Sequence, residues 1–350
     1  MFHKLLITLT VISGMHFVWV EDNVNAESSP ALIVGQLVDV VRLRGTEDIF
    51  LQGDFAYLPC REGKRLTICS IKDPAHPKVV SSFTHSQLGE AAGFAINGNT
   101  VYLTSMSTQR LLVIDVMDKT SPRLLGSVKV GGKGVLYKAA YRDGYCYIPN
   151  LTEKKLFIVD VHNPKQPTVV GSVSITTEND GPFSVMLRGD YALVGTIFGS
   201  RNRLAVVNVK DPGQPRLVTQ VFGPDIGQVS GDAVGDLYYS VYWNNNAFLI
   251  FDISEPGHPR LQGKLVDKRL GKPNRCIVAG NRAYLPMVEG NGVAVVDISN
   301  SRQPQFLTAY RDPVLLKKTY GVAVRGNLLF VASREGNSLV ILDRRVLEKK

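Results

Sequence analysis

The stretch that decides the fold is Leu156-Phe157-Ile158-Val159-Asp160-Val161, an apolar run that a carboxylate interrupts once. Asn163-Pro164 and a second apolar run, Val169-Val170-Gly171-Ser172-Val173, follow it. Six further copies begin at Leu66, Leu111, Leu204, Phe248, Val293 and Leu339. Their fifth positions recur every 44 to 48 residues and hold Asp or Asn in every copy except the first, which has Ser70. A period of this length predicts an array of one repeated supersecondary unit.

Each repeat divides into four segments with the pattern of β-strands. An aromatic residue stands four positions after the first polar turn in six of the seven copies. The members of this column are Tyr57, Tyr102, Tyr147, Leu193, Tyr238, Tyr284 and Phe330. One ring per unit fills the gap between neighbouring sheets, so we interpret these rings as core residues rather than cofactor contacts. The third segment is the near-continuous apolar run, as expected of a strand that is buried on both faces.

The Asp or Asn that ends this run is expected to accept backbone N–H bonds in the turn that follows. The residues concerned are Asp115, Asp160, Asn208, Asp252, Asp297 and Asp343. Each belongs to its own unit and should stand far from the others, so we do not interpret them as a ring of metal ligands. The next turn, Asp73-Pro74-Ala75-His76-Pro77 in the first repeat, is a rigid connection because proline fixes φ and cannot donate to a sheet.

The seventh repeat stops at Lys350, before any fourth strand. A segment of that kind stands at the other end of the chain, where residues 29–37 resemble the fourth segment beginning Ser121-Pro122. We therefore predict that the N-terminal strand completes the last sheet. The array then closes into an all-β, seven-bladed β-propeller of four-stranded antiparallel blades, a single domain over residues 27–350. Closure also removes the open end at which another chain would pair.

Residues 111–115 and 156–160, with their Asp-Pro or Asn-Pro continuations, resemble the LVIVD-repeat family of exported bacterial β-propellers. The resemblance covers residues 30–350. It implies a propeller fold and an exported location. It carries over no catalytic residue, because the family has no shared catalytic motif, and many of its members look like binding or surface proteins.

Residues 1–26 have the pattern of a secretory signal peptide, with Lys4, an apolar run from Leu5 to Val20 and the small-residue cleavage site Val24-Asn25-Ala26. We expect cleavage, the alternative being a retained anchor. No other stretch is apolar for long enough to cross a bilayer. The mature protein is therefore predicted to be secreted, either periplasmic or extracellular, with no stable membrane span.

The chain carries a net charge of +9. A basic surface favours anionic partners, but Lys and Arg are scattered and form only doublets, so no nucleic-acid partner is expected. The four Cys, which are Cys60, Cys69, Cys146 and Cys276, fit no metal-ligand spacing, and we expect buried free thiols. A turn centred on Gly63 would pair Cys60 with about Leu66 and leave Cys69 one strand step too far for a disulfide.

Catalytic signatures are weak in this sequence. Gly-x-Ser-x-Gly, phosphate-loop and nucleotide-binding motifs do not occur. Of six His, two lie in the predicted signal, three lie in or near the proline turns, and His85 remains. One His with scattered carboxylates does not make a zinc or iron site, so no metal and no other cofactor is predicted.

Candidate binding residues gather on one face of the predicted propeller. The loops between second and third strands share a face with the links between blades, and this face carries the sequence variation. Residues 197–203 and 241–246 stand out there. Trp243, the only tryptophan after residue 26, lies beside Tyr242 and three Asn, a composition typical of sugar- or peptide-binding surfaces. The alternative is that Trp243 folds back over the neighbouring blade.

We predict a monomeric ligand-binding or protein-interaction scaffold whose partner is a glycan, peptide or protein, with an anionic one favoured. The predicted ligand-binding residues are Tyr242, Trp243, Asn244, Arg201, Arg275, Lys138 and Tyr320. The alternative is an extracytoplasmic enzyme, a lyase, lactonase-like hydrolase or isomerase, with acid–base groups at the mouth of the central channel. Its predicted catalytic residues are His85, Glu90 and Lys138. A third interpretation is a structural envelope protein, and the fold does not decide among these.

Overall fold

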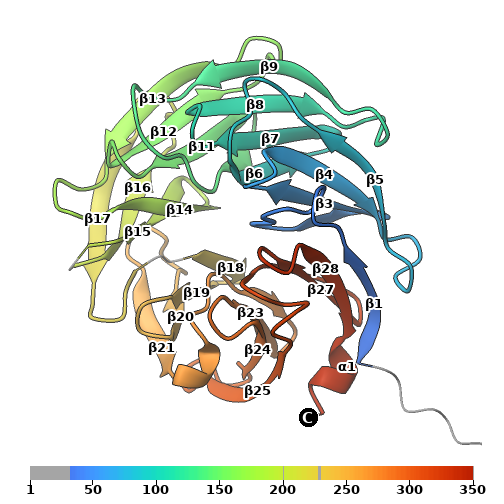
Figure 1. The fold of residues 1–350 in the computed structure, drawn as a ribbon. Coiled ribbons are helices and arrows are strands. Elements are labelled where there is room, and N and C mark those ends of the chain that lie inside the picture. The colour runs from blue at the N-terminus through green and yellow to red at the C-terminus, as the bar shows by residue number, and fades with distance from the viewer. Residues whose placement is uncertain (1–31, 200, 228–229, 350) are drawn as a thin grey trace, which may run out of the picture. The chain divides into compact units, whose positions relative to one another are not determined.

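A computed structural model describes residues 32–199, 201–227 and 230–349, all within one compact unit, Ala31–Lys350. Their strands form seven four-stranded sheets, every neighbouring pair antiparallel, that follow one another around a ring (Figure 1). This confirms the predicted seven-bladed β-propeller. The predicted signal, residues 1–26, lies outside the described residues.

The first strand of each blade is innermost and the fourth is outermost (Figure 1). Blades one and two are β2 (Phe50–Gln52), β3 (Phe55–Cys60), β4 (Arg65–Ser70), β5 (Lys78–Phe83), β6 (Ala91–Asn97), β7 (Thr100–Ser105), β8 (Arg110–Asp115) and β9 (Arg123–Lys129). Blades three and four are β10 (Ala140–Arg142), β11 (Tyr145–Asn150), β12 (Lys155–Asp160), β13 (Thr168–Ser174), β14 (Gly181–Arg188), β15 (Tyr191–Ile197), β16 (Arg203–Asn208) and β17 (Arg216–Phe222).

The remaining blades repeat the same order. Blades five and six are β18 (Ser230–Val234), β19 (Leu237–Tyr242), β20 (Ala247–Asp252), β21 (Arg260–Val266), β22 (Ile277–Ala279), β23 (Arg282–Met287), β24 (Gly292–Asp297) and β25 (Gln305–Arg311). Blade seven is β26 (Thr319–Arg325), β27 (Leu328–Ser333), β28 (Ser338–Asp343) and β1 (Ile33–Val38). The described helices are η1 (Lys268–Leu270) and α1 (Arg344–Leu347), and neither has the length or apolar character to cross a membrane.

The ring is closed by the N-terminal strand. β1 pairs antiparallel with β28, from Ile33 opposite Leu342 to Val38 opposite Ser338. Val34 and Leu37 pack against a buried cluster that includes residues of blades seven and one. The predicted closure is therefore confirmed, and side-chain packing supports it in addition to the backbone hydrogen bonds.

The core lies within and between adjacent blades. All seven residues of the aromatic column are buried. Tyr57 of blade one, for example, shares a cluster with Val101 and Leu103 of blade two. Burying such a ring stabilises the fold by about 1.5–3 kcal/mol. The structural interpretation of the column is confirmed.

One hydrogen bond recurs where the third strand ends in six of the blades. The Oδ1 atoms of Asp115, Asp160, Asn208, Asp252, Asp297 and Asp343 each accept the backbone N–H two residues later, at 2.9 to 3.0 Å. The side chain satisfies a donor that leaves the sheet at this point, so the position needs a short oxygen-bearing side chain. The predicted role of these residues is confirmed.

All four cysteines are buried and free, as predicted. The register predicted for the first hairpin is wrong by one residue. Cys60 lies opposite Arg65 rather than Leu66, and Cys69 lies opposite Ala56. The loop has four residues and Lys64 adopts a φ of 50°, so its centre falls between Glu62 and Gly63 instead of on Gly63.

Candidate functional site

Two hollows adjoin on the face that carries the links and the second-to-third loops, hereafter the loop face. The axial cavity has a volume of about 350 Å³ and is lined by Glu47, Arg61, Ala92, Met106, Tyr137, Lys138, Phe183, Ile197, Phe198, Trp243, Asn244, Asn274 and Tyr320. Every blade, with the link that leads into it, contributes to this lining, so the cavity lies on the ring axis.

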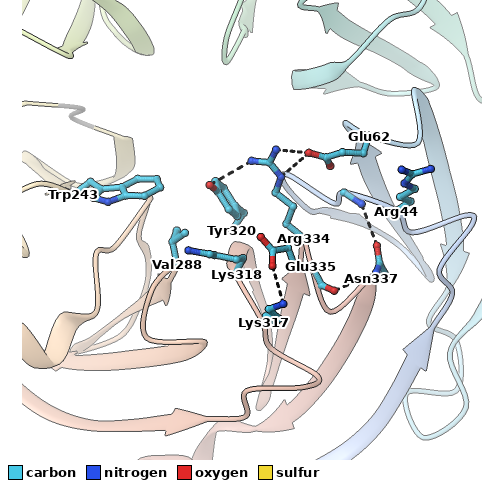
Figure 2. Close-up of a pocket in the computed structure, with 11 residues that line it drawn as sticks. Arg44, Glu62, Trp243, Val288, Lys317, Lys318, Tyr320, Arg334, Glu335 and Asn337 are labelled. Atoms are coloured by element: carbon cyan, nitrogen blue, oxygen red, sulfur yellow. Dashed lines mark hydrogen bonds and ion pairs between the residues drawn. The ribbon is translucent and has the colours of Figure 1, made fainter.

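The second hollow, the rim groove, has a volume of about 540 Å³ (Figure 2). It is lined by Arg44, Gly45, Glu62, Trp243, Val288, Lys317, Lys318, Tyr320, Arg334, Glu335 and Asn337. Trp243 and Tyr320 line both hollows. The groove is therefore a lateral continuation of the cavity past this pair of rings.

Two ring pairs contribute to the aromatic lining of the cavity. Trp243 meets Tyr320 edge to face, with ring centroids 6.2 Å apart and planes inclined by 67°. Figure 2 shows the indole extending toward Tyr320. Tyr137 and Phe183 have centroids 4.4 Å apart. Trp243 thus contacts blade seven, two positions along the ring from its own blade five, instead of folding back over an adjacent blade.

Lys138 carries the ammonium group that lines the axial cavity. Its side chain is 17% exposed, and its Nζ donates to Ser230 Oγ at 3.1 Å. The nearest described carboxylate oxygen is Asp48 Oδ2 at 4.0 Å, and Asp48 already forms a close ion pair with Arg275. Burial lowers the pKa of Lys138 to about 8. Below that pH the ammonium lacks a carboxylate of its own at hydrogen-bonding distance among the described residues.

The remaining charges nearby are balanced. Glu47 Oε1 lies 3.1 Å from Arg61 Nη1 and 3.3 Å from Arg334 Nη1, and Arg334 also pairs with Glu62. Burial raises the pKa of Glu47, although Arg334 and Arg61 oppose that effect. Arg334 also lies over the ring of Tyr320, 5.3 Å from its centroid. This network fixes Tyr320 at the boundary between the two hollows (Figure 2).

Two glycines of inner strands let the links reach the axis. A Cβ on Gly93 of β6 would lie 2.5 Å from Lys138 Cα, and one on Gly321 of β26 would lie 2.8 Å from the backbone carbonyl carbon of Asp48. Such distances are not tolerated between non-bonded carbon atoms. The links that carry Lys138 and Asp48 therefore occupy their positions only because these strands lack side chains there.

The blade-four loop supplies an aromatic at the mouth of the cavity. Phe198 is 66% exposed and has a φ of 70°, which is unusual for a bulky residue. Asn202 stabilises the loop by accepting from Gly199 N at 3.0 Å and donating to Gly199 O at 3.1 Å. The same amide nitrogen donates to Tyr242 Oη at 2.9 Å. Gly199, the residue that follows Phe198, is therefore held by Asn202, which is itself bonded to blade five.

A buried ion pair anchors the same loop to the preceding link. Arg203 donates to both carboxylate oxygens of Asp180, at 2.9 and 3.0 Å, with the two side chains 4% and 0% exposed. Asp180 also accepts from Thr176 Oγ1 at 2.8 Å. Asp180 is therefore buried in this pair and lines neither the axial cavity nor the rim groove.

Four of the predicted ligand-binding residues line the axial cavity together: Lys138, Trp243, Asn244 and Tyr320. Tyr242 is only 6% exposed, and its hydroxyl accepts from Asn202 and Asn244, so it supports the two loops from within the core.

The other two predicted binding residues lie elsewhere. Arg275 is part-buried, and its guanidinium pairs with Asp48. Arg201 lies in a separate hollow beside Phe222, with its guanidinium carbon 4.1 Å from that ring centroid.

The residues predicted for catalysis do not share one hollow. His85 stacks on Phe83, and its Nδ1 accepts from Gln87 N at 3.1 Å. The backbone N–H of Glu90 donates to Ser107 Oγ at 3.4 Å. Neither residue is among those lining the cavity or the groove, while Lys138 is. Across the described ranges, no cluster of three His, Cys, Asp or Glu is arranged to hold a metal ion.

Sequence reasoning missed Glu47, Arg61 and Arg334, together with the apolar lining residues Met106 and Phe183. It singled out the loop 197–203 but assigned no role to Phe198. The charged residues belong to links or to second-to-third loops, the positions already expected to vary. Nothing in the sequence indicated that Glu62 and Arg334, whose loops are more than 270 residues apart, form an ion pair.

The fold and these hollows define a seven-bladed β-propeller with a cavity on the axis of its loop face. The chain belongs to the LVIVD-repeat family, whose repeat model matches residues 44–85, 88–130, 140–175, 229–267, 271–312 and 317–343. Blade four lies between two of these matches and is not itself matched.

Solved structures share the fold at low sequence identity. Virginiamycin B lyase from Staphylococcus aureus is 10% identical with a TM-score of 0.66, covering 88% of this chain and 98% of that one. The WD40 propeller domain of Doa1 is 12% identical with a TM-score of 0.66, covering 89% and 96%. A putative 6-phosphogluconolactonase from Bacteroides fragilis is 12% identical with a TM-score of 0.65, covering 79% and 86%. The sequence matches no curated protein. Such distant likeness establishes the fold alone.

Proposed function

We propose that this protein is an exported, monomeric binding protein that holds a small ring-bearing carboxylate in its axial cavity. The observation that carries the proposal is the position of Lys138 in a cavity lined by Trp243, Tyr320, Tyr137 and Phe183. Among the described residues no carboxylate lies within hydrogen-bonding distance of its ammonium, since Asp48 Oδ2 is 4.0 Å away. Of the partners expected from the sequence, which are glycans, peptides and proteins, this proposal takes up only a small anionic ligand such as a sugar acid.

Charge complementarity supports an anionic ligand. A buried ammonium is unfavourable unless it is paired, and Asp48 is neutralised by Arg275. A ligand carboxylate beside Lys138 Nζ would complete the pair and form a charge-assisted hydrogen bond. Because the bound anion favours the ammonium, binding would raise the pKa of Lys138 above about 8.

The size and lining of the cavity support a compact ligand with a ring. Small-molecule sites enclose roughly 300–1,000 Å³, are mostly apolar and contain a few directed polar groups. The axial cavity has about 350 Å³, four aromatic rings besides Phe198, and the amides of Asn244 and Asn274. The rings would contact the flat faces of the ligand, and the amides would bond its hydroxyl or carbonyl groups.

Fluorescence titration tests this proposal. We would use the full chain with Trp19→Phe, so that Trp243 is its single tryptophan. The probes are uronic acids and substituted benzoates, each beside its uncharged methyl ester. We expect saturable changes in Trp243 emission for an acid and not for its ester. Lys138→Met should weaken binding at least about tenfold, the scale of one lost charge-assisted hydrogen bond.

The matched control is Lys268→Met, which removes an exposed ammonium from the link between blades five and six. It should leave the affinity unchanged. Equal binding of acids and esters, or equal loss in both variants, would contradict the proposal. Thermal shift measured in parallel would detect ligands that do not alter Trp243 emission.

A second candidate function, the extracytoplasmic lyase, lactonase-like hydrolase or isomerase, has one observation in its favour. Glu47 and Lys138 line the same cavity, where burial raises the pKa of the acid and lowers that of the amine to about 8. Groups shifted in this way are suited to proton transfer near neutral pH. The roles predicted for His85 and Glu90 remain predictions. Product formation from lactones or uronates that is abolished by Glu47→Gln, with binding retained, would favour the enzyme.

A further inference from the structure

Two cationic side chains that line the rim groove, Arg44 and Lys318, take no part in the ion pairs among the described residues around them. Lys317 pairs with Glu335 at 3.1 Å, and Arg334 pairs with Glu47 and Glu62. Arg44 and Lys318 also line the groove, and in the described part of the chain the side chain of neither forms an ion pair. The groove therefore has a surplus of two positive charges over its own carboxylates.

These cations and the cavity ammonium are spread along one connected hollow. Lys138 lies in the axial cavity, and the shared rings of Trp243 and Tyr320 mark its junction with the groove. Beyond the junction, Figure 2 shows Lys318 extending toward Val288 on the Trp243 side, and Arg44 on the far side of the Arg334–Glu62 pair. The rings of Trp243 and Tyr320 thus separate the cavity ammonium from Lys318, and the Arg334–Glu62 pair separates Lys318 from Arg44, so the cationic positions are not gathered at one point.

A ligand that fits this arrangement carries negative charges at intervals, with rings between them. A single small anion would satisfy Lys138 and leave Lys318 and Arg44 without partners. A chain of uronic acid residues has one carboxylate per sugar ring, and sugar rings pack on Trp and Tyr side chains through their apolar faces. Its hydroxyl groups would also find amide partners in Asn244 at the junction and Asn337 in the groove.

We propose that the rim groove binds the continuation of an acidic oligosaccharide whose terminal uronate occupies the axial cavity, with Lys318 and Arg44 contacting successive carboxylates. This inference rests on the proposed function, because it assigns the ring-bearing carboxylate of the cavity to a sugar acid. It adds a second subsite and a polymeric ligand class.

The test compares oligomers of increasing length. Galacturonic acid and its dimer and trimer are titrated against the full chain with Trp19→Phe, beside galactose and galactobiose as uncharged counterparts. Each added uronate should tighten binding about three- to tenfold, the scale of a partly exposed ion pair, and the gain should shrink in high salt. Lys318→Gln and Arg44→Gln should remove the gain from length while leaving the affinity for the monomer unchanged.

Lys317→Gln is the matched control, because it removes an equal charge from the same groove at a residue already paired with Glu335. If it weakens trimer binding as much as Lys318→Gln does, the groove acts through net charge only and the subsite assignment is wrong. An oligothymidylate that carries the same charge and binds as tightly as the trimer would overturn the assignment to a sugar acid.

The outcomes separate this inference from the proposed function. If the monomer binds in a Lys138-dependent manner and length adds nothing, the groove subsite is refuted and the cavity proposal stands. If trimer binding depends on Lys318 and Arg44 but Lys138→Met does not change its affinity, the cavity proposal is refuted and the groove subsite is retained. Absence of binding by every uronide refutes the sugar-acid assignment, and if the substituted benzoates do not bind either, the cavity proposal is refuted as well.

Discussion

The two faces of the propeller are built from the same seven repeats, yet they differ in what they preserve. On the turn face, formed by the first-to-second and third-to-fourth turns, six Asp or Asn residues make the same backbone hydrogen bond in six blades. On the loop face, each blade contributes different side chains to the axial cavity. Side chains that bond to the backbone recur from blade to blade, because each blade needs those hydrogen bonds. Side chains that only project from the loop face are free to vary.

Blade four shows the contrast within a single blade. On the turn face it keeps the side-chain bond, with Asn208 accepting from Lys210 N at 3.0 Å. On the loop face it has the buried Arg203–Asp180 pair and the positive φ of Phe198. The family model matches the other six blades and not this one. Four predictions follow from the contrast between the faces, in order of decreasing expected effect.

Loss of the blade-four ion pair should have the largest effect on stability. Asp180→Ala leaves the buried guanidinium of Arg203 with only the part-exposed Glu178 carboxylate at 3.1 Å, so we expect unfolding to become easier by about 3–5 kcal/mol. Chemical denaturation measures this. Asp236→Ala, which breaks the exposed pair with Arg188, should cost less than about 1 kcal/mol. Equal costs would show that the buried pair does not anchor the loop face.

Removal of the cavity ammonium should stabilise the protein. Below pH 8 the folded state carries the full desolvation penalty of Lys138, whose pKa falls to about 8, so Lys138→Met should be more stable by roughly 1–3 kcal/mol at pH 7. Between pH 8 and about 10.4 the folded state loses this proton before the unfolded state does. Wild-type stability therefore rises relative to the variant over that range.

Denaturant unfolding of both proteins at pH 7, 9 and 10.5 tests this, since other titrating groups cancel in the difference. The stability gap should close as the pH rises. A gap that is constant with pH would contradict the lowered pKa. A variant less stable than wild type at pH 7 would show that the bond to Ser230 outweighs the desolvation penalty.

Two hydrogen-bonded tyrosine hydroxyls on opposite faces provide a comparison, one on the buried Tyr242 and one on the part-buried Tyr141. Tyr242→Phe removes the acceptor for Asn202 and Asn244, and Tyr141→Phe removes the acceptor for Asn97 and Gly144 N. Each should lower stability by about 1–2 kcal/mol. Only Tyr242→Phe should also weaken ligand binding, because it loosens the loop that positions Phe198. An equal effect of both variants on binding would remove the distinction between the faces.

The repeated turn bond should have the smallest effect and the most uniform one. Asn208→Ala removes the repeated acceptor in blade four. Asn300→Ala removes an acceptor of the same kind in blade six, three residues after the repeated Asp297. Each of the two amides bonds a backbone N–H two residues later. Each should lower stability by about 0.5–1 kcal/mol, and the two losses should add because the sites are far apart. Neither should alter ligand affinity. A much larger loss in blade four would show that its turn face is specialised too.

Most of the fold was predictable because it depends on short-range patterns. Three patterns predicted the closed ring that β1 and β28 form. They are the apolar run with its Asp or Asn, the aromatic column, and the lack of a fourth-strand segment in the seventh repeat. The one register error came from a loop conformation, the φ of 50° at Lys64, which residue types around Gly63 do not reveal.

The site was predictable only in part. Trp243, Asn244, Lys138 and Tyr320 were found because they are unusual residues at positions known to lie on the loop face. Tyr242 and Arg201 belong to the same two loops, yet the chain turns one into the core and the other toward Phe222. Adjacency in sequence does not fix side-chain direction in a loop, so composition alone could not separate them.

The sequence by itself determined the repeat, the number of blades, the ring closure and the face on which variation collects, because each follows from periodicity and local hydrogen bonding. Only the tertiary structure decided which charges remain unpaired. Asp48 pairs with Arg275, and Arg334 pairs with Glu62, because the closed ring brings together residues more than 220 positions apart in the sequence. Among the described residues that line the two hollows, these pairings leave Lys138, Lys318 and Arg44 without a carboxylate at hydrogen-bonding distance. That residual charge depends on three-dimensional neighbours that no local pattern encodes.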